Sequence, residues 1–317
     1  MARAYASTIV DAKVEAVWDA VRDFNALPAW VPAVERSEIE DGLPSDAVGC
    51  VRNFRMRDGG QVRERLLALD DSRYRFAYNF ETPAFPVTEY LAEFELIPVT
   101  NGDRTFAQWS AGFDEKPEDK GKYVEIVSAQ VFAAGLKGLS GQVAGRPVPA
   151  GAARWQGLRP AKVFCSSVID GPVEAVWARM RDIAGMAEWH PDIGDMAMLD
   201  GARPDRISGV RDFRFGEGHL REQLTFLCDR THAFRYKINE SPMPWMNYHA
   251  GARLYPVSDA GRTFAVWTAD WVASANDDAT LIPAVRDGVF QKAFDTLNET
   301  FFGGNAGTSA RAAAPPA

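Results

Sequence analysis

The chain has 317 residues, of which 46% are hydrophobic and 25% are charged, and it carries a net charge of −8. This composition is typical of a folded globular protein. The acidic balance argues against a nucleic-acid partner. The sequence has no run of about 18 apolar residues and no signal-peptide segment at its start, so we expect no membrane insertion and a cytoplasmic location.

Two pairs of short segments show that the sequence is a tandem duplication. Val-Glu-Ala-Val-Trp at 14–18 returns at 173–177, and Arg-Thr-Phe-Ala at 104–107 returns at 262–265. A repeat of about 150 residues is the size of a whole domain rather than of a solenoid unit. We therefore expect two domains, each with its own core.

Composition sets the expected boundaries of these domains. Residues 144–160 are rich in Pro, Gly and Ala and lack hydrophobic periodicity, which is typical of a linker. The last residues have too little apolar bulk to offset the entropy of ordering. We expect a first domain at 1–143, the linker at 144–160, a second domain at 161–303 and a disordered tail at 304–317.

In the first half, alternation and turn residues predict seven strands, and helical periodicity predicts two main helices. The strands are expected at 5–10, 34–40, 48–56, 61–69, 74–80, 88–98 and 105–114. The helices are expected at 14–24 and 119–139. A short helical turn is expected within 26–34, where Pro28 and Pro32 prevent a longer helix.

The second half repeats this order. It predicts a strand at 162–169, a helix at 173–183, six further strands ending near Ala273 and a closing helix at 279–302. Pro283 would fall in the first turn of that helix, where its missing amide hydrogen costs little.

This order of elements predicts an α+β fold in each half. A six-stranded antiparallel meander must curl around the long helix to cover its apolar stripe. We therefore expect two tandem helix-grip domains, each a curved antiparallel sheet around a long C-terminal helix. A concave sheet facing one helix leaves an internal cavity of ligand size.

Residues in both halves resemble those of a known family. The Val-Glu-Ala-Val-Trp helices, the Trp-x-Pro turns at Trp30 and Trp189 and the Val-Arg pairs at 51–52 and 210–211 resemble the START-like (SRPBCC) superfamily. The polyketide cyclase/dehydrase-like branch is the most similar, with plant lachrymatory-factor-synthase-like proteins as neighbours. The resemblance implies the helix-grip fold. It leaves the reaction open, because members include cyclases, lyases, isomerases, carriers and receptors.

The most informative polar residues are two pairs, Arg52 with Glu64 and Arg211 with Glu222. The arginines are 159 residues apart and the glutamates 158, so the intervening turns differ by one residue. A three-residue loop in the first half and a two-residue hairpin in the second both place the arginine directly opposite its glutamate. Alternation then puts both pairs on the cavity face of the sheet.

Three roles are open for these pairs. The guanidinium can bind a substrate carbonyl, enolate or carboxylate while the partly desolvated carboxylate moves a proton. It can instead anchor a ligand without chemistry. The pair can also be a cross-strand ion pair that satisfies itself within the sheet.

Equivalent aromatic residues in the two halves can line the cavity or pack the core. They are Trp30, Tyr78, Tyr90 and Trp109 in the first half and Trp189, Tyr236, Tyr248 and Trp267 in the second. His190 replaces Val31 at the expected cavity mouth, where it can move protons near neutral pH or lie in solvent. The second half thus carries the fuller catalytic set, because only it adds a histidine to its Arg-Glu pair and tyrosines.

The sequence gives no support for metal or nucleotide chemistry. Cys50, Cys165 and Cys228 form no close pair and do not occupy equivalent positions, so neither disulfides nor a zinc site are indicated. There is no glycine-rich phosphate loop and no His, Asp and Glu cluster at metal-ligand spacing. We therefore expect no metal and no cofactor.

Two functions fit these features. The first is a cofactor-independent enzyme that cyclises, dehydrates or isomerises a small aromatic or polyketide-like compound. The alternative is a non-catalytic carrier of hydrophobic metabolites. A third, a co-chaperone or regulatory partner, would require an exposed apolar patch. For both the enzyme and the carrier, the partner is a small hydrophobic ligand. The sequence leaves homodimer formation open.

Overall fold

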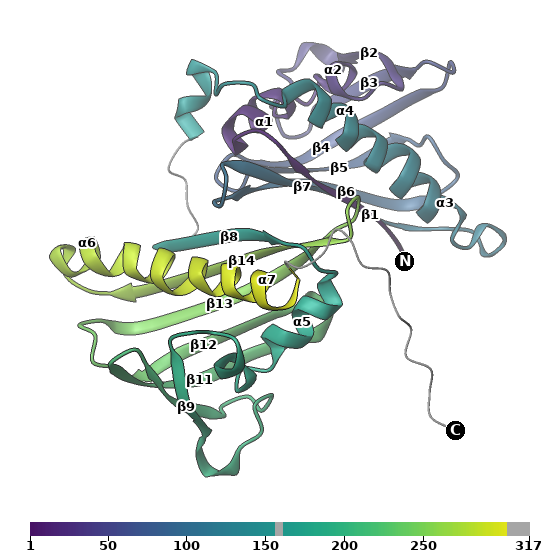
Figure 1. Cartoon of the computed structure of the whole chain (residues 1–317). Coiled ribbons are helices and arrows are strands. Elements are labelled where there is room, and N and C mark those ends of the chain that lie inside the picture. The colour runs from purple at the N-terminus through teal and green to yellow at the C-terminus, as the bar shows by residue number, and fades with distance from the viewer. Residues whose placement is uncertain (156–160, 303–317) are drawn as a thin grey trace.

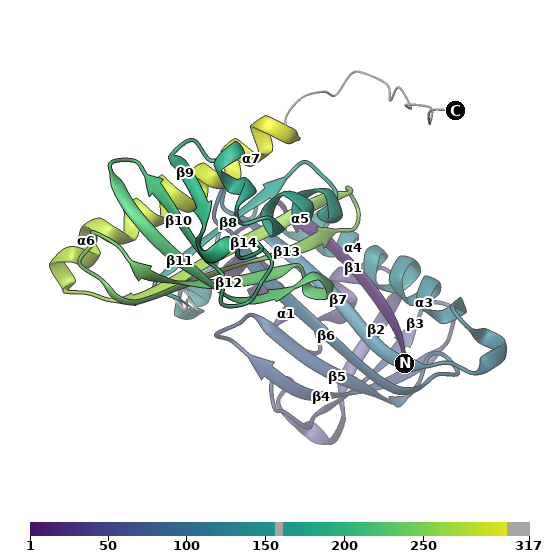
Figure 2. The same cartoon turned by 90° about the horizontal axis from the view of Figure 1, so that it is seen from below.

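The computed structural model describes residues 1–155 and 161–302 and shows two antiparallel sheets of seven strands each (Figures 1 and 2). A long C-terminal helix packs against each sheet. This confirms the expected pair of tandem helix-grip domains. The expected tail at 304–317 and residues 156–160 of the expected linker lie outside the described residues.

The first half follows the order of elements expected from the sequence. Its strands are β1 (Ala2–Val10), β2 (Val34–Ile39), β3 (Val51–Met56), β4 (Gln61–Asp70), β5 (Arg75–Thr82), β6 (Thr88–Val99) and β7 (Arg104–Asp114). Its α-helices are α1 (Val14–Val21), α2 (Leu27–Trp30), α3 (Lys122–Glu125) and α4 (Ala134–Val143). A π-helical segment, Ile126–Ala133, joins α3 to α4, and short 3-10 turns lie at Glu40–Gly42, Pro117–Asp119 and Ala150–Trp155.

The second half repeats this arrangement. Its strands are β8 (Val163–Ile169), β9 (Ile193–Met198), β10 (Val210–Phe215), β11 (Gly218–Cys228), β12 (Ala233–Glu240), β13 (Met246–Val257) and β14 (Arg262–Val272). Its α-helices are α5 (Val173–Arg181), α6 (Ala275–Pro283) and α7 (Lys292–Phe301), and a π-helical segment, Ala284–Gln291, joins α6 to α7. Short 3-10 turns lie at Gly185–Glu188, Leu199–Gly201 and Asp229–Thr231.

Each sheet is a meander to which the first strand returns. The strand orders are β1-β7-β6-β5-β4-β3-β2 and β8-β14-β13-β12-β11-β10-β9, so β1 and β8 lie at an edge beside the last strand of their half. The helix after the first strand fits its sequence pattern, because Val14, Val17, Trp18 and Val21 of α1 are all buried. The core of each half lies between its sheet and its C-terminal helix.

The second closing helix begins earlier than expected. The side chain of Ser274 caps α6 by accepting a hydrogen bond from the Asp277 amide (3.1 Å), so Pro283 lies inside the helix and not in its first turn. The proline removes one i to i−4 hydrogen bond, and the helix continues in π geometry. The first half is π-helical at the equivalent positions without a proline, so Pro283 alone does not set this geometry.

Part of the expected linker is ordered against the first half. Residues Ala150–Trp155 form a 3-10 turn, and Ala152 is fully buried in the first core. Ala152, within the expected linker, thus packs on the first half.

Candidate functional site

The first Arg-Glu pair lies in the core, in the register expected from the sequence. Arg52 on β3 stands opposite Glu64 on β4, and their exposed fractions are 2% and 5%. Arg52 Nε and Nη2 lie 2.7 and 2.6 Å from Glu64 Oε2. Nη1 donates to the carbonyl oxygen of Phe24 (2.8 Å), and the guanidinium carbon lies 3.8 Å from the centre of the Phe24 ring. Every guanidinium nitrogen is thus engaged by the protein.

The second pair repeats this geometry. Arg211 on β10 stands opposite Glu222 on β11. Arg211 Nε donates to Glu222 Oε2 (2.8 Å), and Nη2 donates to the same oxygen. Nη1 donates to the carbonyl oxygen of Ile183 (2.6 Å) and lies 3.2 Å from the sulfur of Met186.

Both pairs therefore join two strands to the segment that follows the first helix of their half. Burial raises the pKa of the Glu64 and Glu222 carboxyls, and the adjacent guanidinium opposes this rise. A ligand could bind either guanidinium in place of its present partners only by displacing a protein oxygen. In this arrangement each pair acts first as a structural clamp.

The tyrosines lie where the sequence placed them, on neighbouring strands beside the clamps. Tyr236 and Tyr248 are buried with ring centres 6.4 Å apart, and Tyr78 and Tyr90 are buried 6.3 Å apart. Burial raises the pKa of all four phenols well above the usual 10. They are therefore neutral hydroxyls that can donate hydrogen bonds. Tyr78 already accepts one from Trp109 Nε1 (2.9 Å).

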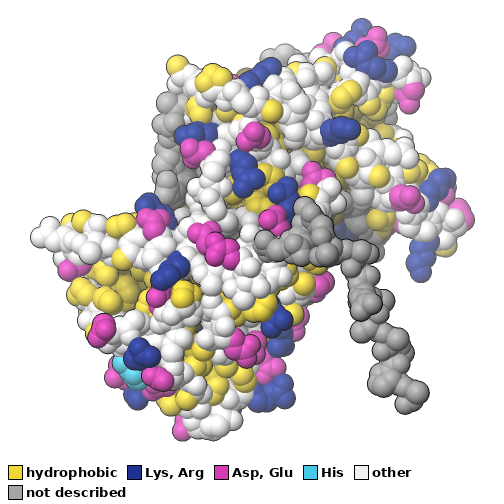
Figure 3. Space-filling view, in the orientation of Figure 1, with side chains coloured by type: hydrophobic (Ala, Val, Ile, Leu, Met, Phe, Trp, Pro, Cys, Tyr) yellow, Lys and Arg dark blue, Asp and Glu magenta, His cyan; other side chains and the backbone are white. Residues whose placement is uncertain are grey.

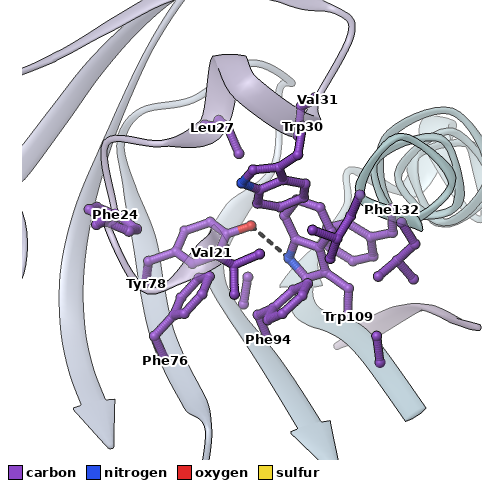
Figure 4. Close-up of a cluster of buried hydrophobic side chains, with 14 of the residues drawn as sticks. Val21, Phe24, Leu27, Trp30, Val31, Phe76, Tyr78, Phe94, Trp109 and Phe132 are labelled. Atoms are coloured by element: carbon purple, nitrogen blue, oxygen red, sulfur yellow. Dashed lines mark hydrogen bonds between the residues drawn. The ribbon is translucent and has the colours of Figure 1, made fainter. Parts of the chain in front are cut away.

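Aromatic rings fill the interior of the first grip (Figure 4). Phe94 stacks on Phe76 with ring centres 5.2 Å apart and meets the edge of Trp109 at 5.5 Å. Trp109 stacks on Phe132 of the C-terminal helix at 4.7 Å, and Trp30 lies 5.4 Å from Trp109. These rings occupy the space between sheet and helix.

The second grip keeps this frame but lacks one ring. Ala252 occupies the position of Phe94. Trp267 still stacks on Phe290 of the π-helical segment (4.8 Å) and meets the edge of Phe234 at 5.7 Å. Trp189, the equivalent of Trp30, is buried, and its Nε1 has no hydrogen-bond partner within the described part of the chain. The Trp30 Nε1 is likewise unpaired there, so this feature does not distinguish the halves.

The two grips also differ at the end where a strand-connecting loop meets the C-terminal helix. In the first half, Phe85 of the β5–β6 loop packs on Tyr123 of α3, with ring centres 5.9 Å apart. Met243 and Leu281 occupy these positions in the second half, and 46% of Met243 is exposed. Figure 3 shows a hollow lined by hydrophobic side chains below α6, at this end of the second half.

An aromatic cluster follows the β12–β13 loop of the second half. Half-buried Trp245 lies 4.7 Å from Tyr248, and Tyr248 stacks on Trp271 at 5.6 Å. Met246, which follows Trp245 in the chain, is 66% exposed. Our sequence reasoning did not identify Trp245, Trp271 or the two methionines. A position-by-position comparison of the halves is the signal that could have found them.

His190 is buried with an exposed fraction of 4%, so the solvent-exposed alternative is wrong. Its Nδ1 accepts a hydrogen bond from the Asp192 amide (3.3 Å), and its ring lies 5.4 Å from that of Phe215. Burial lowers the pKa of His190. Asp192 pairs with Lys292 of α7 (2.7 Å) and ties this turn to the C-terminal helix.

A separate cavity of about 790 Å³ lies between the halves. Its apolar wall includes Phe164, Tyr255 and Val266 from the second half and Ile97 from the first. Its four basic and four acidic side chains balance: Lys13, Arg73, Arg104, Arg286, Glu15, Glu95, Asp103 and Asp287. None of the candidate site residues lines it, so this cavity is distinct from the grip interiors.

Within residues 1–155 and 161–302, every helix is too short or too polar to cross a bilayer. Over the same residues, no three His, Cys, Asp or Glu side chains are grouped so that they could hold a metal ion. The three cysteines are free.

Two curved sheets, each gripping a C-terminal helix over an aromatic interior, define a tandem protein of the helix-grip class. The family model described as "Polyketide cyclase / dehydrase and lipid transport" matches residues 1–144 and 160–301. The chain therefore belongs to this family, with one family domain in each half. This confirms the resemblance to the polyketide cyclase/dehydrase-like branch of the START-like superfamily.

Several solved structures are similar to one half or to most of the chain. Protein XoxI from Bacillus cereus is 26% identical, with a TM-score of 0.42, over 46% of this chain and 97% of its own. A protein from Thermobifida fusca is 29% identical, with a TM-score of 0.41, over 49% and 96%. The di-domain ARO/CYC BexL from the BE-7585A biosynthetic pathway is 12% identical, with a TM-score of 0.39, over 94% and 98%. No curated protein matches the chain.

Proposed function

We propose that the second half binds a small, flat hydrophobic ligand, aromatic or polyketide-like, inside its grip, and that the first half braces it. Family membership supports a role in hydrophobic-ligand binding or in cyclisation. The observation that carries the choice of half is the hydrophobic hollow at this end of the second grip (Figure 3). Met243 and Leu281 replace the Phe85–Tyr123 contact that covers the same end of the first half.

The interior of the second grip supports the same choice. An aromatic ligand can stack on the ring cluster near this end, which is formed by Trp245, Tyr248 and Trp271. The exposed Met243 and Met246 flank Trp245 and suit ligands of varied shape, because their side chains are flexible and polarisable. Further in, Ala252 leaves Trp267 without the ring contact that Phe94 gives Trp109.

The clamp geometry favours binding without chemistry at the guanidinium. Arg211 already donates from all three nitrogens to Glu222, Ile183 and Met186. These bonds use four of its five N–H groups, and its side chain is buried, so the guanidinium is largely engaged by the protein. This supports the carrier function ahead of catalysis through Arg211.

Acid-base catalysis is the second candidate, and the carboxyl of Glu222 is the observation that favours it. Burial raises its pKa, which moves a carboxylate toward the range where it can exchange protons near neutral pH. Tyr236 and Tyr248 supply neutral hydroxyl donors beside it. In this scheme Glu222 moves the proton in a cofactor-independent cyclisation, dehydration or isomerisation, and Arg211 positions it.

A reciprocal exchange of the end residues tests the binding proposal. The double change Met243→Phe with Leu281→Tyr should cover the second grip as the first is covered. We expect titration calorimetry to show that the wild-type protein binds 1-naphthol at one site per chain. The covered variant should bind at least about tenfold more weakly, a difference of about 1.4 kcal/mol. Phe85→Met with Tyr123→Leu is the matched control in the first half and should leave that affinity unchanged.

Two results would overturn the proposal: undiminished binding by the covered second half, or loss of binding in the control alone. Native mass spectrometry of protein purified from its host would then identify the natural ligand. With a substrate in hand, Glu222→Gln should abolish turnover while Glu64→Gln retains it. Full activity in Glu222→Gln would rule out Glu222 as the group that moves the proton.

A further inference from the structure

The contact between the halves includes two matching sets of hydrogen bonds. In the first, Ser7 of β1 meets the turn between β13 and β14. The Ser7 amide donates to Ser258 Oγ (2.8 Å), and Ser258 Oγ donates to the Ser7 carbonyl oxygen (3.0 Å). Ser7 Oγ donates to the Pro256 carbonyl oxygen (2.6 Å) and accepts from the Ser258 amide (3.0 Å). Figures 1 and 2 both show this hairpin alongside β1.

The second set repeats the first with the halves exchanged. The Ser166 amide on β8 donates to Thr100 Oγ1 (2.8 Å), and Thr100 Oγ1 donates to the Ser166 carbonyl oxygen (2.9 Å). Ser166 Oγ donates to the Pro98 carbonyl oxygen (2.7 Å) and accepts from the Thr100 amide (2.9 Å). Ser166, Thr100 and Pro98 are the sequence equivalents of Ser7, Ser258 and Pro256. The four bonds therefore correspond one by one.

Equivalent residues also meet each other at the centre of this contact. Phe106 and Phe264, one from each repeat of Arg-Thr-Phe-Ala, stack with ring centres 4.5 Å apart and planes 14° apart. Val99 and Val257, a further equivalent pair, complete a buried apolar cluster around them. A residue that touches its own equivalent lies on a two-fold axis. The halves thus meet as the two copies of a symmetric dimer do.

The contact satisfies groups that a separate half would expose. β1 and β8 are edge strands, so the amide and carbonyl of Ser7 and Ser166 have a partner across the interface instead of a neighbouring strand. Phe106 and Phe264 are fully buried here, in a cluster that is separate from the core of either half and contains residues of both. Each half therefore carries both an edge strand and a hairpin that can cover the edge strand of another half.

We propose that this surface is self-complementary, so that its partner can be any half of this chain, including the same half of a second copy. Ser258 and Thr100 present the same hydroxyl to the edge strand, and Pro256 and Pro98 present the same carbonyl. A pair of two first halves or of two second halves keeps every bond in both sets. Within one chain, the tether favours pairing of the two different halves because it raises their effective concentration.

Cutting the folded chain between Trp155 and Ala161 tests this proposal. A protease recognition sequence is inserted there, and the cut protein is studied by native mass spectrometry, which separates the three kinds of pair by mass. We expect the halves to stay paired after cutting at micromolar concentration. On incubation, pairs of two first halves and pairs of two second halves should appear beside the original mixed pair.

Substitutions show whether these pairs use the surface described here. Phe264→Asp places a charge against Phe106 and should release the cut halves, and Ser258→Ala is a milder variant that should weaken the pair while preserving the fold. Leu91→Asp is the control, because Leu91 also lies on a strand but is 49% exposed. The proposal is overturned if mixed pairs are the only species at every concentration, or if the cut halves separate without any substitution. It is also overturned if Ser258→Ala and Phe264→Asp pair as wild type does.

Discussion

Replacement of Arg52 by methionine is the sharpest test of the clamp. The change keeps an unbranched side chain of similar length but removes the guanidinium that meets Glu64 and the Phe24 carbonyl. Breaking a buried ion pair from one side costs about 3–5 kcal/mol, because the remaining charge stays buried without its partner. Loss of the cation–π contact with the Phe24 ring adds about 0.5–2 kcal/mol. Protonation of Glu64 limits the total, since burial already raises its pKa, and we expect a loss of about 4 kcal/mol.

Urea unfolding followed by circular dichroism measures this free energy of unfolding. The double variant Arg52→Met with Glu64→Leu removes both charges, so it should recover most of the loss and leave mainly the unpaired Phe24 carbonyl, at about 1–3 kcal/mol. Arg65→Met is the control, because its pair with Glu81 is partly exposed, and it should stay within about 1 kcal/mol of wild type. A loss below about 1 kcal/mol in Arg52→Met, or a double variant no more stable than the single one, would refute the clamp.

Three further predictions follow from the halves and their differences. Burial lowers the pKa of His190 in the folded state, so as the pH falls the unfolded state binds a proton on this ring before the folded state does. The free energy of unfolding should therefore fall as the pH drops below about 6.5. His190→Val should remove that part of the pH dependence in urea titrations. Phe94→Ala should lower the free energy of unfolding by about 3–5 kcal/mol in urea. Ala252→Phe should weaken 1-naphthol binding in calorimetry. Unchanged affinity in Ala252→Phe would place the ligand elsewhere. A fragment of residues 1–155 should be folded by circular dichroism and more thermally stable than 1–145, because only the longer one keeps Ala152 in the core; equal melting temperatures would contradict this.

The sequence by itself determined the duplication, the order of strands and helices, and the register of both Arg-Glu pairs. These features depend on short-range information. Helical and strand periodicity act over neighbouring residues, and the length of the turn after β3 or β10 decides which residues face each other across the hairpin. The same rules failed at Pro283, because Ser274 caps the helix and α6 begins at Ala275, four residues before the expected start at 279.

Only the tertiary structure decided how the two grips differ and how the halves meet. Phe94, Phe76 and Trp109 fill the first grip because three separate strands bring their rings together, and no local pattern encodes that contact. His190 is buried because α7 and its Lys292, about a hundred residues away, hold the turn that carries it. The Phe106–Phe264 stack likewise exists only once both sheets have formed, since it joins equivalent residues of two domains that fold around separate cores.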